Sequence, residues 1–487
     1  MIPIYFRELE PYRKSYIKKL LGEEIYEKLL ESNHIFLDKD NCKFDFVGVI
    51  LLNNYVLRCY PKYMPYAEPE GLNELEKDFE VVMKVIKKYK KQNEPFQYEN
   101  EVLKKIPFNL LSLMLFFIED YYENGVYSNI RNVLEINGNG EINWEKTIND
   151  NFALIKNNKP YYVELYTQYK IDDLYNYFRL LHEYIITKCS KHLKDAGLLD
   201  IFGLVHLELS DKSKNDFGDD KFILAMLEKE LNMEFNTHKR KLLKSMHAYI
   251  SNENSFDNEN FLTLYGANSY EQIWEKICSE VFDNKLRSII DNLNLEIDSN
   301  YKYEPTDTLF DIIEKPNWVF NEGFSNNKRK SLEPDIITFD GKSFIILDAK
   351  YYDFTYKEDK INGPGISDIT KQYLYQLAYN DFKKAAGFEK VRNAFLMPTF
   401  DSQVKNVGFV ELKMLHELCG GKNKMYLENI QIVLLPASDM NNYYLNGVKM
   451  PISELELDKY YCPACDCFNK IENEYCGHCG EKLNRDD

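Results

Sequence analysis

Two apolar runs near the start of the chain predict a β-hairpin. The first run covers residues 44–52 and the second covers residues 55–63, and both are rich in β-branched, aliphatic and aromatic residues. Only Asn53 and Asn54 separate them, and a two-residue loop of this kind between apolar runs favours a tight hairpin. We therefore expect a β-rich domain over residues 1–68.

The remaining pattern divides the chain into further parts. Pro, Glu and Gly cluster near residues 65–71, and the residues that follow carry Leu, Tyr and Lys at helical spacing, which predicts a mainly helical domain over residues 69–260. Helix and strand patterns alternate through residues 261–450, and a short module, residues 451–487, comes last. A chain of 487 residues has room for several domains, each with its own core. We predict the α+β multidomain class.

A second hairpin is predicted where Asp340 and Gly341 stand between two apolar runs. The runs cover residues 333–339 and 342–350, and an Asp-Gly step between such runs is a strong hairpin signal. If Asp340 and Gly341 are the two loop residues, then Phe339 faces Lys342. The rest of the register follows from this assignment.

Counting back from this loop brings two acids and a lysine to one face of the hairpin. Asp335 lies opposite Ile346, one diagonal step from Asp348, and Lys350 shares that face because side chains alternate along a strand. Diagonal neighbours lie about 7–8 Å apart at the backbone, so two carboxylates can converge on one cation. The alternative is an edge hairpin in which Lys350 forms a salt bridge with one Asp.

Asp335, Asp348 and Lys350 together suit metal-assisted phosphodiester hydrolysis. Two converging carboxylates repel each other unless a positive charge lies between them, and Mg²⁺ prefers such oxygen ligands. The metal would lower the pKa of a bound water and offset charge on the scissile phosphate. Lys350 would orient or deprotonate that water, or stabilise the charge of the transition state.

A helix before this hairpin offers one further metal ligand. Ser269 and Gln272 form a capping-box pattern ahead of an apolar stripe, which predicts a well-formed helix. Glu271 and Glu275 are one turn apart beside the stripe, and we take Glu275 as the candidate Mg²⁺ ligand. The alternative is an exposed acidic flank.

A helix after the hairpin offers two amides. Pro364 and Gly365 form a loop, and Asp368 caps a helix on which Gln372 and Gln376 share one face. Both glutamines suit hydrogen bonds to a water or a phosphate, so we include them among the candidate catalytic residues. A solvated polar face is the alternative.

The cysteines fall into two groups. Two C-x2-C pairs near the C-terminus predict a zinc ribbon with a closed, structural Zn²⁺ site, with a redox pair as the alternative. We interpret the scattered cysteines as small buried hydrophobic residues of a reduced, cytoplasmic protein. The four predicted zinc ligands are Cys462, Cys465, Cys476 and Cys479. The scattered cysteines are Cys42, Cys59, Cys189, Cys278 and Cys419.

The formal net charge of -17 argues against DNA binding by this chain alone, because a protein that binds DNA unaided usually presents a basic face. Basic runs occur at residues 84–91, 239–244 and 328–330, and the last stands just before Asp335. The first two are also typical of solvated helix faces. We expect another subunit to deliver the DNA. No apolar run approaches about 18 residues and the start lacks a signal-peptide pattern, so we expect a cytoplasmic protein with no membrane contact.

The motifs resemble known nuclease families. Pro334-Asp335, Asp348-Ala349-Lys350 and the glutamine-bearing helix resemble the PD-(D/E)XK nuclease superfamily, although that family often has Glu at the position of Asp348. Residues 46–50 and 59–63 look like the N-terminal signature of LlaJI-type and McrC-type restriction subunits.

This resemblance implies a mixed central sheet flanked by helices, and a restriction endonuclease subunit that works with an AAA+ GTPase of the McrB-like kind on double-stranded DNA. Asp335 and Asp348 match the family's metal ligands and Lys350 its catalytic lysine, whereas Glu275, Gln372 and Gln376 match less closely. A Mg²⁺-dependent DNA endonuclease of an anti-phage defence system is thus the leading hypothesis. A DNA repair or recombination nuclease and a non-catalytic zinc-ribbon adaptor that binds DNA or protein are the alternatives.

Overall fold

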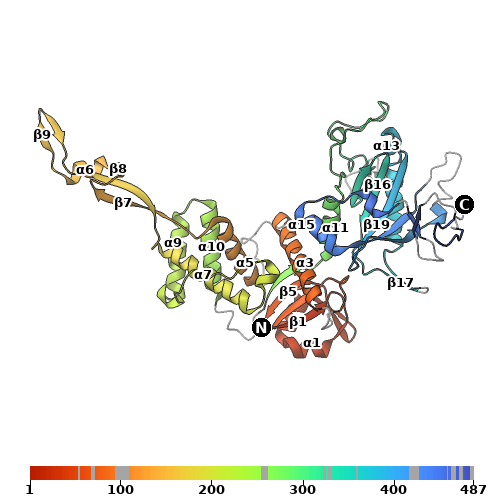
Figure 1. Ribbon diagram of the computed structural model, residues 1–487, viewed down its shortest axis with the longest axis horizontal. Helices are drawn as coiled ribbons and strands as arrows, with labels where there is room; N and C mark the ends of the chain where they lie inside the picture. Colours follow the sequence, from red (N-terminus) through yellow and green to blue (C-terminus); the bar gives the residue numbers. More distant parts are fainter. Residues whose placement is uncertain are drawn as a thin grey trace. The chain divides into compact units, whose positions relative to one another are not determined.

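The computed structural model shows an α+β protein whose chain divides into two compact units (Figure 1). The first unit comprises residues 1–4, 50–57 and 105–265, and the second comprises residues 5–49, 58–104 and 266–487. The α+β class predicted from the sequence is confirmed, while the predicted domain boundaries stay predictions. The described residues are 1–52, 55–66, 72–93, 109–253, 262–319, 321, 325–326, 331–357, 360–415, 427–457, 459–461, 468–470 and 475–482.

The N-terminal residues form two small sheets. One has the order β2-β4-β3 and the other has the order β1-β6-β5-β12, so the two runs of the predicted first hairpin are neighbouring strands, β5 and β6. Gly266 in β12 has to be glycine, since a Cβ there would lie 2.2 Å from the carbonyl oxygen of Val47. The bounds are β1 Ile2–Arg7, β2 Tyr12–Arg13, α1 Lys14–Leu21, α2 Glu23–Glu31, β3 Ile35–Asp38, β4 Asn41–Phe44, β5 Val47–Leu52, β6 Tyr55–Tyr60 and β12 Leu262–Ala267.

The second unit contains a five-stranded mixed sheet with the order β15-β16-β19-β21-β20. β15 and β16 are antiparallel, β16, β19 and β21 are parallel, and β20 runs antiparallel to β21. The last six of the seven residues of β16 are buried, as expected of a central strand that is covered on both faces. The bounds are β15 Ile336–Asp340, β16 Ser343–Ala349, β19 Lys390–Thr399, β20 Lys405–Val410 and β21 Ile430–Pro436.

The register of the β15–β16 hairpin differs from the prediction. Asp340 pairs with Ser343 and Phe339 pairs with Phe344, so the loop residues are Gly341 and Lys342. Gly341 has a φ of +55°, a left-handed conformation that glycine adopts without strain. The expected pairing of Phe339 with Lys342 is therefore wrong.

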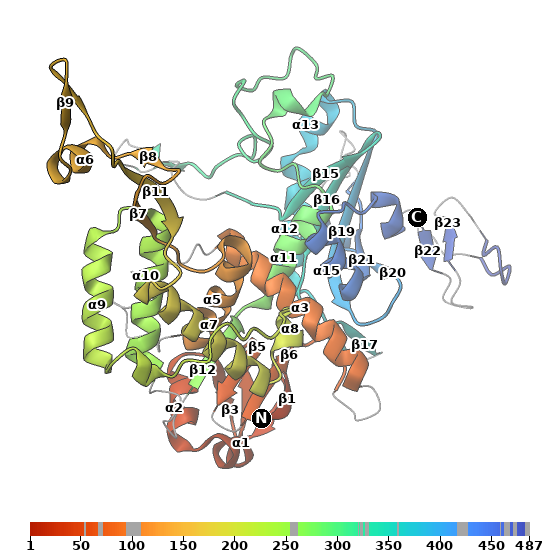
Figure 2. The ribbon, with the colours of Figure 1, turned by 60° about the vertical axis from the view of Figure 1, so that its left-hand side comes forward.

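Helices cover this sheet (Figure 2). Tyr375 of α12 and Tyr379, the residue that follows this helix, pack with Phe344 and Ile346 of β16 in one core cluster. α11 contacts β16, and α15 contacts β21, α11 and the long helix α3. The bounds are α3 Leu72–Asn93, α11 Tyr270–Val281, α12 Ile366–Ala378, α13 Asn380–Ala385 and α15 Ala437–Asn446. The short strands of this unit are β13 Trp318–Val319, β14 Ser325–Asn326, β17 Thr355–Lys357, β18 Lys360–Asn362, β22 Lys459–Tyr461 and β23 Phe468–Lys470.

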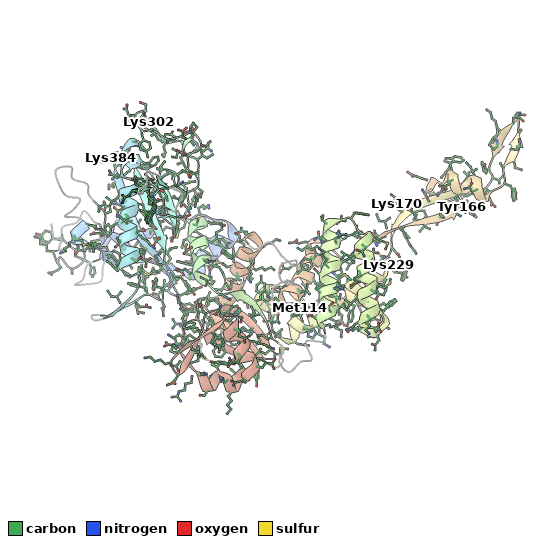
Figure 3. The ribbon with its side chains drawn as sticks, turned by 180° about the vertical axis from the view of Figure 1, so that it is seen from behind. Met114, Tyr166, Lys170, Lys229, Lys302 and Lys384 are labelled. Atoms are coloured by element: carbon green, nitrogen blue, oxygen red, sulfur yellow. The ribbon has the colours of Figure 1, made fainter. Side chains whose placement is uncertain are left out.

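The first unit is a helical body with a β-rich arm, defined as residues 130–172. In Figure 3, Tyr166 and Lys170 mark strand β11 of the arm and Met114 marks helix α5 of the body. The helices of the body are α5 Leu110–Asn124, α7 Tyr177–Asp195, α8 Leu199–Phe202, α9 Asp220–Met233 and α10 Thr237–Asn252. The arm contains β7 Ile130–Ile136, β8 Glu141–Ile142, α6 Trp144–Asp150, β9 Leu154–Lys156, β10 Lys159–Tyr161 and β11 Tyr166–Asp172.

The arm adds short strands to the mainly helical middle that the sequence predicts. Asn157 and Asn158 have φ values of 52° and 57° between the paired strands β9 and β10, a left-handed pair typical of tight hairpins. Among the residues that the structure describes, no helix is long and apolar enough to cross a membrane.

Candidate active site

The candidate site lies where β16 ends and β15 begins. The observed register, continued by one residue, puts Asp335 directly opposite Asp348 and not opposite Ile346 as expected. The predicted common face is correct, because Asp335 and Asp348 lie on the same side of the hairpin. The two acids are thus closer neighbours than the diagonal arrangement would have made them.

Asn284, which follows helix α11, fixes the beginning of β15. Its Nδ2 donates to the carbonyl oxygen of Asp335 at 2.7 Å, and its Oδ1 accepts from the amide of Ile337 at 3.1 Å. The Asp335 carboxylate in turn accepts a hydrogen bond from the Ala349 amide at 2.9 Å. Hydrogen bonds therefore fix both the backbone and the side chain of Asp335. Nothing in the sequence pattern marks Asn284, since its partners lie about 50 residues further along the chain.

Lys350 lies within the same cluster. Its Nζ is 2.8 Å from Oδ2 of Asp348 and 3.5 Å from Oδ1 of Asp368, and the side chains of Lys350 and Asp348 are only 16% and 6% exposed. The salt bridge that the sequence left as an alternative is therefore present. It is compatible with a catalytic role, because the lysine and both acids meet at one point and not along an exposed edge.

The charges in this cluster are strongly perturbed. Burial is the main cause that raises the pKa of Asp335, and the carboxylates of Asp348 and Glu275 add to it. Burial also raises the pKa of Asp348, although the Lys350 ammonium opposes this shift. Burial acts to lower the pKa of Lys350, but the carboxylates of Asp348 and Asp335 outweigh it and the pKa is raised. Lys350 is therefore cationic, and the two acids share a proton unless a cation replaces it.

Helix α11 brings Glu275 towards this cluster. The indole Nε1 of Trp274 donates to the carbonyl oxygen of Leu396 at 3.1 Å, and the amide of Lys350 donates to the same oxygen at 2.9 Å. Burial raises the pKa of Glu275, and the charge of Asp348 contributes while that of Lys350 opposes the shift. Glu275 is thus an electrostatic neighbour of the site, and its role as a metal ligand stays a prediction.

The two glutamines of α12 have different surroundings. Gln376 uses both ends of its amide on the backbone of Glu428, with Nε2 donating to the carbonyl oxygen and Oε1 accepting from the amide, each at 2.8 Å. Gln372 is fully buried and its Nε2 donates to Oδ1 of Asn393 at 2.6 Å. In the described part of the chain, Oε1 of Gln372 has no hydrogen-bond partner.

Two further side chains of α12 belong to the cluster. Asp368 was expected to cap the helix. The helix begins at Ile366, and Asp368 accepts from the Gly365 amide at 3.3 Å while it also lies near Lys350. Tyr375 donates its hydroxyl to the carbonyl oxygen of Glu333 at 2.9 Å, and its pKa is raised by burial and then by the charges of the two acids. Tyr375 carries an apolar ring on the packed face of α12, so its sequence context indicates only core packing.

The donor set fits a hard divalent cation. Asp335 and Asp348 supply buried carboxylate oxygens that are hydrogen-bonded to each other, and a divalent cation would neutralise them better than one shared proton. Within the described ranges, no group of three His, Cys, Asp or Glu side chains is arranged to hold a metal ion. Glu275 is therefore near the two acids without forming a three-carboxylate group with them.

The structure describes two of the four cysteines that are predicted to bind zinc. Cys462 and Cys465 lie outside the described residues, while Cys476 is buried and Cys479 is exposed. The Sγ of Cys476 accepts from Nδ2 of Asn469 at 3.3 Å and from the amide of His478 at 3.4 Å, an arrangement that favours a thiolate. Cys42, Cys59, Cys189 and Cys278 are buried as expected, and Cys419 lies outside the described residues.

Comparison with known proteins defines the class as restriction endonucleases. Residues 46–438 match the model of the LlaJI restriction endonuclease family, and because this match spans most of the chain, the chain belongs to that family. The family inferred from the sequence motifs is thereby confirmed. A curated relative, the type II restriction enzyme BsuMI component YdjA of Bacillus subtilis (strain 168), is 29% identical over 471 residues, which cover 93% of this chain and 91% of the relative.

Solved structures give a weaker likeness. A chain in the refined half-complex from the tetradecameric assembly of Thermococcus gammatolerans McrB AAA+ hexamers with bound McrC is 11% identical with a TM-score of 0.38, covering 91% of this chain and 99% of that chain. A chain in the cryo-EM structure of the Thermococcus gammatolerans McrBC complex is 12% identical with a TM-score of 0.23, covering 57% and 86%.

Proposed function

We propose that this protein is the Mg²⁺-dependent DNA endonuclease subunit of a restriction system that defends against phage. The observation that carries the proposal is the meeting of Asp335, Asp348 and Lys350 at the end of one buried hairpin. Family membership supports the nuclease activity. We assign the five-stranded sheet with α11 and α12 to the PD-(D/E)XK type, since two acids and a lysine on adjacent strands follow that pattern.

Asp335 and Asp348 would hold the Mg²⁺, with the nearby Glu275 as a further carboxylate that would bind it through water. When bound, Mg²⁺ supplies Lewis acidity towards water and towards the scissile phosphate. Asn284 and the Ala349 amide keep Asp335 in place for this role. The shared proton of the two acids has to leave before a cation is bound between them.

Lys350 acts as a fixed positive charge in this proposal. The carboxylates of Asp348 and Asp335 raise its pKa in the metal-free chain, and its ammonium would stabilise the negative charge that develops on the phosphate. Asp368 keeps one side of the ammonium occupied at 3.5 Å and so restrains its direction. Gln372 stays a candidate for contact with the substrate through its unpartnered Oε1, whereas Gln376 would have to leave Glu428 to take part.

A partner would supply DNA recognition. The proposed partner is an AAA+ GTPase that binds double-stranded DNA and brings it to this chain. Three observations support a separate component: the net charge of -17, the description of the curated relative as a component of a restriction enzyme, and the exposed apolar side chains of the arm. We also propose a structural Zn²⁺ held by Cys462, Cys465, Cys476 and Cys479, supported by the hydrogen bonds to the Cys476 sulfur.

The test is cleavage of duplex DNA by the purified chain together with its partner component. We expect cleavage with Mg²⁺ and none after chelation, and we expect Asp335→Ala and Lys350→Ala to reduce the rate by at least about 10³-fold. The matched control is Asp401→Ala with Lys405→Ala, which removes an exposed acid–lysine pair from the same unit and should leave cleavage unchanged.

The outcomes separate the candidate functions. Full cleavage by both site variants would contradict the assigned centre. Cutting confined to branched or single-stranded DNA ends would favour a repair or recombination nuclease. Binding of DNA or of a partner with no metal-dependent turnover, in the wild-type chain, would favour the non-catalytic adaptor.

A further inference from the structure

Lys62 lies against the two residues that follow the site lysine. Its Nζ is 4.2 Å from the ring centroid of Tyr351 and 5.8 Å from that of Tyr352, so the ammonium rests on two aromatic faces. Lys62 belongs to the N-terminal signature, residues 59–63, for which the nuclease chemistry gives no role. Almost 290 residues separate Lys62 from Lys350, yet Lys62 contacts the two residues that directly follow Lys350.

The backbone of Lys62 is fixed to the same place. Its amide donates to Oε2 of Glu8 at 3.1 Å and to the hydroxyl of Tyr351 at 3.3 Å, and that hydroxyl donates to Glu8 at 2.5 Å. Glu8 is only 4% exposed. These hydrogen bonds hold the backbone of Lys62 beside Tyr351, just after the end of β16. The position of the Lys62 Cα is therefore fixed.

The ammonium of Lys62 remains available for an anion. Throughout the residues that the structure describes, it forms no salt bridge within 4.0 Å, and the side chain is partly exposed. Burial lowers its pKa, and the charges of four carboxylates, those of Glu8, Glu271, Asp45 and Asp353, oppose that shift.

We propose that Lys62 is a second phosphate-binding cation of the nuclease site, which positions the DNA by contacting a backbone phosphate next to the scissile one. This inference rests on the proposed function, because it assumes that DNA occupies the site beside Lys350. Lys62 is a positioning residue: it holds the substrate in register and does not touch the reacting atoms. The aromatic faces of Tyr351 and Tyr352 keep the ammonium extended without neutralising it.

The first experiment measures binding of duplex DNA by the assembled enzyme, with Ca²⁺ replacing Mg²⁺ so that the DNA stays intact. We expect Lys62→Met to weaken binding about tenfold, as for one charge-assisted hydrogen bond, and to reduce the slope of log affinity against log salt by about 0.9. Lys62→Arg should retain most of the affinity. In Mg²⁺, Lys62→Met should raise KM about tenfold with kcat changed less than about threefold.

The matched control is Lys43→Met. Lys43 lies over the ring of Phe36 at 6.0 Å, as Lys62 lies over that of Tyr351, but its charge is neutralised by Asp38 at 2.7 Å. We expect no change in affinity or salt slope for this variant. A lower Tm of Lys62→Met with an unchanged salt slope would show a structural role only and overturn the proposal.

A second measurement needs no variant. Reductive methylation of lysines in the wild-type enzyme, with and without duplex DNA in Ca²⁺, should show that DNA protects Lys62 at least about fivefold and leaves Lys43 unprotected. Equal labelling of Lys62 with and without bound DNA would overturn the proposal. If the wild-type enzyme binds DNA with these Lys62 effects but never cuts it, then the proposed function fails while the phosphate contact stands.

Discussion

Asp335 carries an energetic cost in the fold, since its carboxylate is buried opposite a second carboxylate. We predict that Mg²⁺ raises the Tm of the wild-type chain, because the cation binds the folded state and neutralises both acids. Asp335→Asn should abolish this shift and, in chelator, should leave the Tm equal to or above that of the wild type. Thermal melts with and without Mg²⁺ measure both effects. A full Mg²⁺-induced shift in Asp335→Asn would place the cation elsewhere.

The residues of the site could be predicted from the sequence, but their register could not. An Asp-Gly step suggests a loop formed by those two residues, whereas the structure extends β15 through Asp340 and places Gly341 first in the loop. The loop moves by one residue, so each pairing shifts by two and the side-chain faces are preserved. Face assignment therefore survived an error that changed which residue lies opposite Asp335.

At the scale of elements, α12 was recognised from its sequence but its contacts were not. A polar pair one turn apart looks the same whether it faces solvent, a substrate or a distant backbone. The partner of Gln376 is Glu428, which lies 52 residues further along the chain and outside any local pattern. Asn284 and Asp335 are connected in the same non-local way.

We predict that Gln376→Ala destabilises the chain by about 1–3 kcal/mol, because it removes the side chain that pairs with both the amide and the carbonyl oxygen of the partly buried Glu428. Urea unfolding measures the loss. Cleavage per folded molecule should stay within about threefold of the wild type. Loss of cleavage with unchanged stability would instead support the catalytic role that the sequence first suggested for this glutamine.

Helix α7 carries a buried titratable group. His182 is fully buried, its Nδ1 accepts from the Tyr127 amide at 3.0 Å, and burial together with the charge of His238 lowers its pKa to about 3. The folded chain therefore resists protonation of His182, and stability is lost as the pH falls below the unfolded pKa of about 6.5. The loss from this residue should reach about 2 kcal/mol at pH 5.

Urea unfolding of the wild type and of His182→Asn at pH 7 and pH 5 tests this expectation. The Asn side chain retains an acceptor for the Tyr127 amide but cannot titrate. The difference in stability between the two pH values should be about 2 kcal/mol smaller in the variant. An equal difference in both proteins would show that His182 is not the group responsible.

The arm shows where element prediction failed. Its strands are short and largely exposed, so apolar alternation was weak, and the helical periodicity of the flanking segments dominated the interpretation. The Asn157-Asn158 step was the available signal. Turn residues would therefore have marked this region better than hydrophobic periodicity.

At the scale of the whole molecule, the exposed apolar residues of the arm are best explained by a partner. Phe152 is 99% exposed and Trp144 is 54% exposed, which is unusual for large apolar side chains. We predict that Phe152→Ser with Trp144→Ser changes the free energy of unfolding by less than about 0.5 kcal/mol but weakens assembly with the partner component at least about tenfold. Analytical ultracentrifugation of the mixture measures assembly. Unchanged assembly would exclude these residues from the interface.

We propose that Asp335 and Asp348 form the metal centre of a nuclease. The anomalous scattering of Mn²⁺, used in place of Mg²⁺, in crystals of the full chain tests this proposal. We predict a peak about 2 Å from carboxylate oxygens of both Asp335 and Asp348, and no peak there in Asp348→Asn crystals. A peak at neither carboxylate, or one that persists in Asp348→Asn, would contradict the claim.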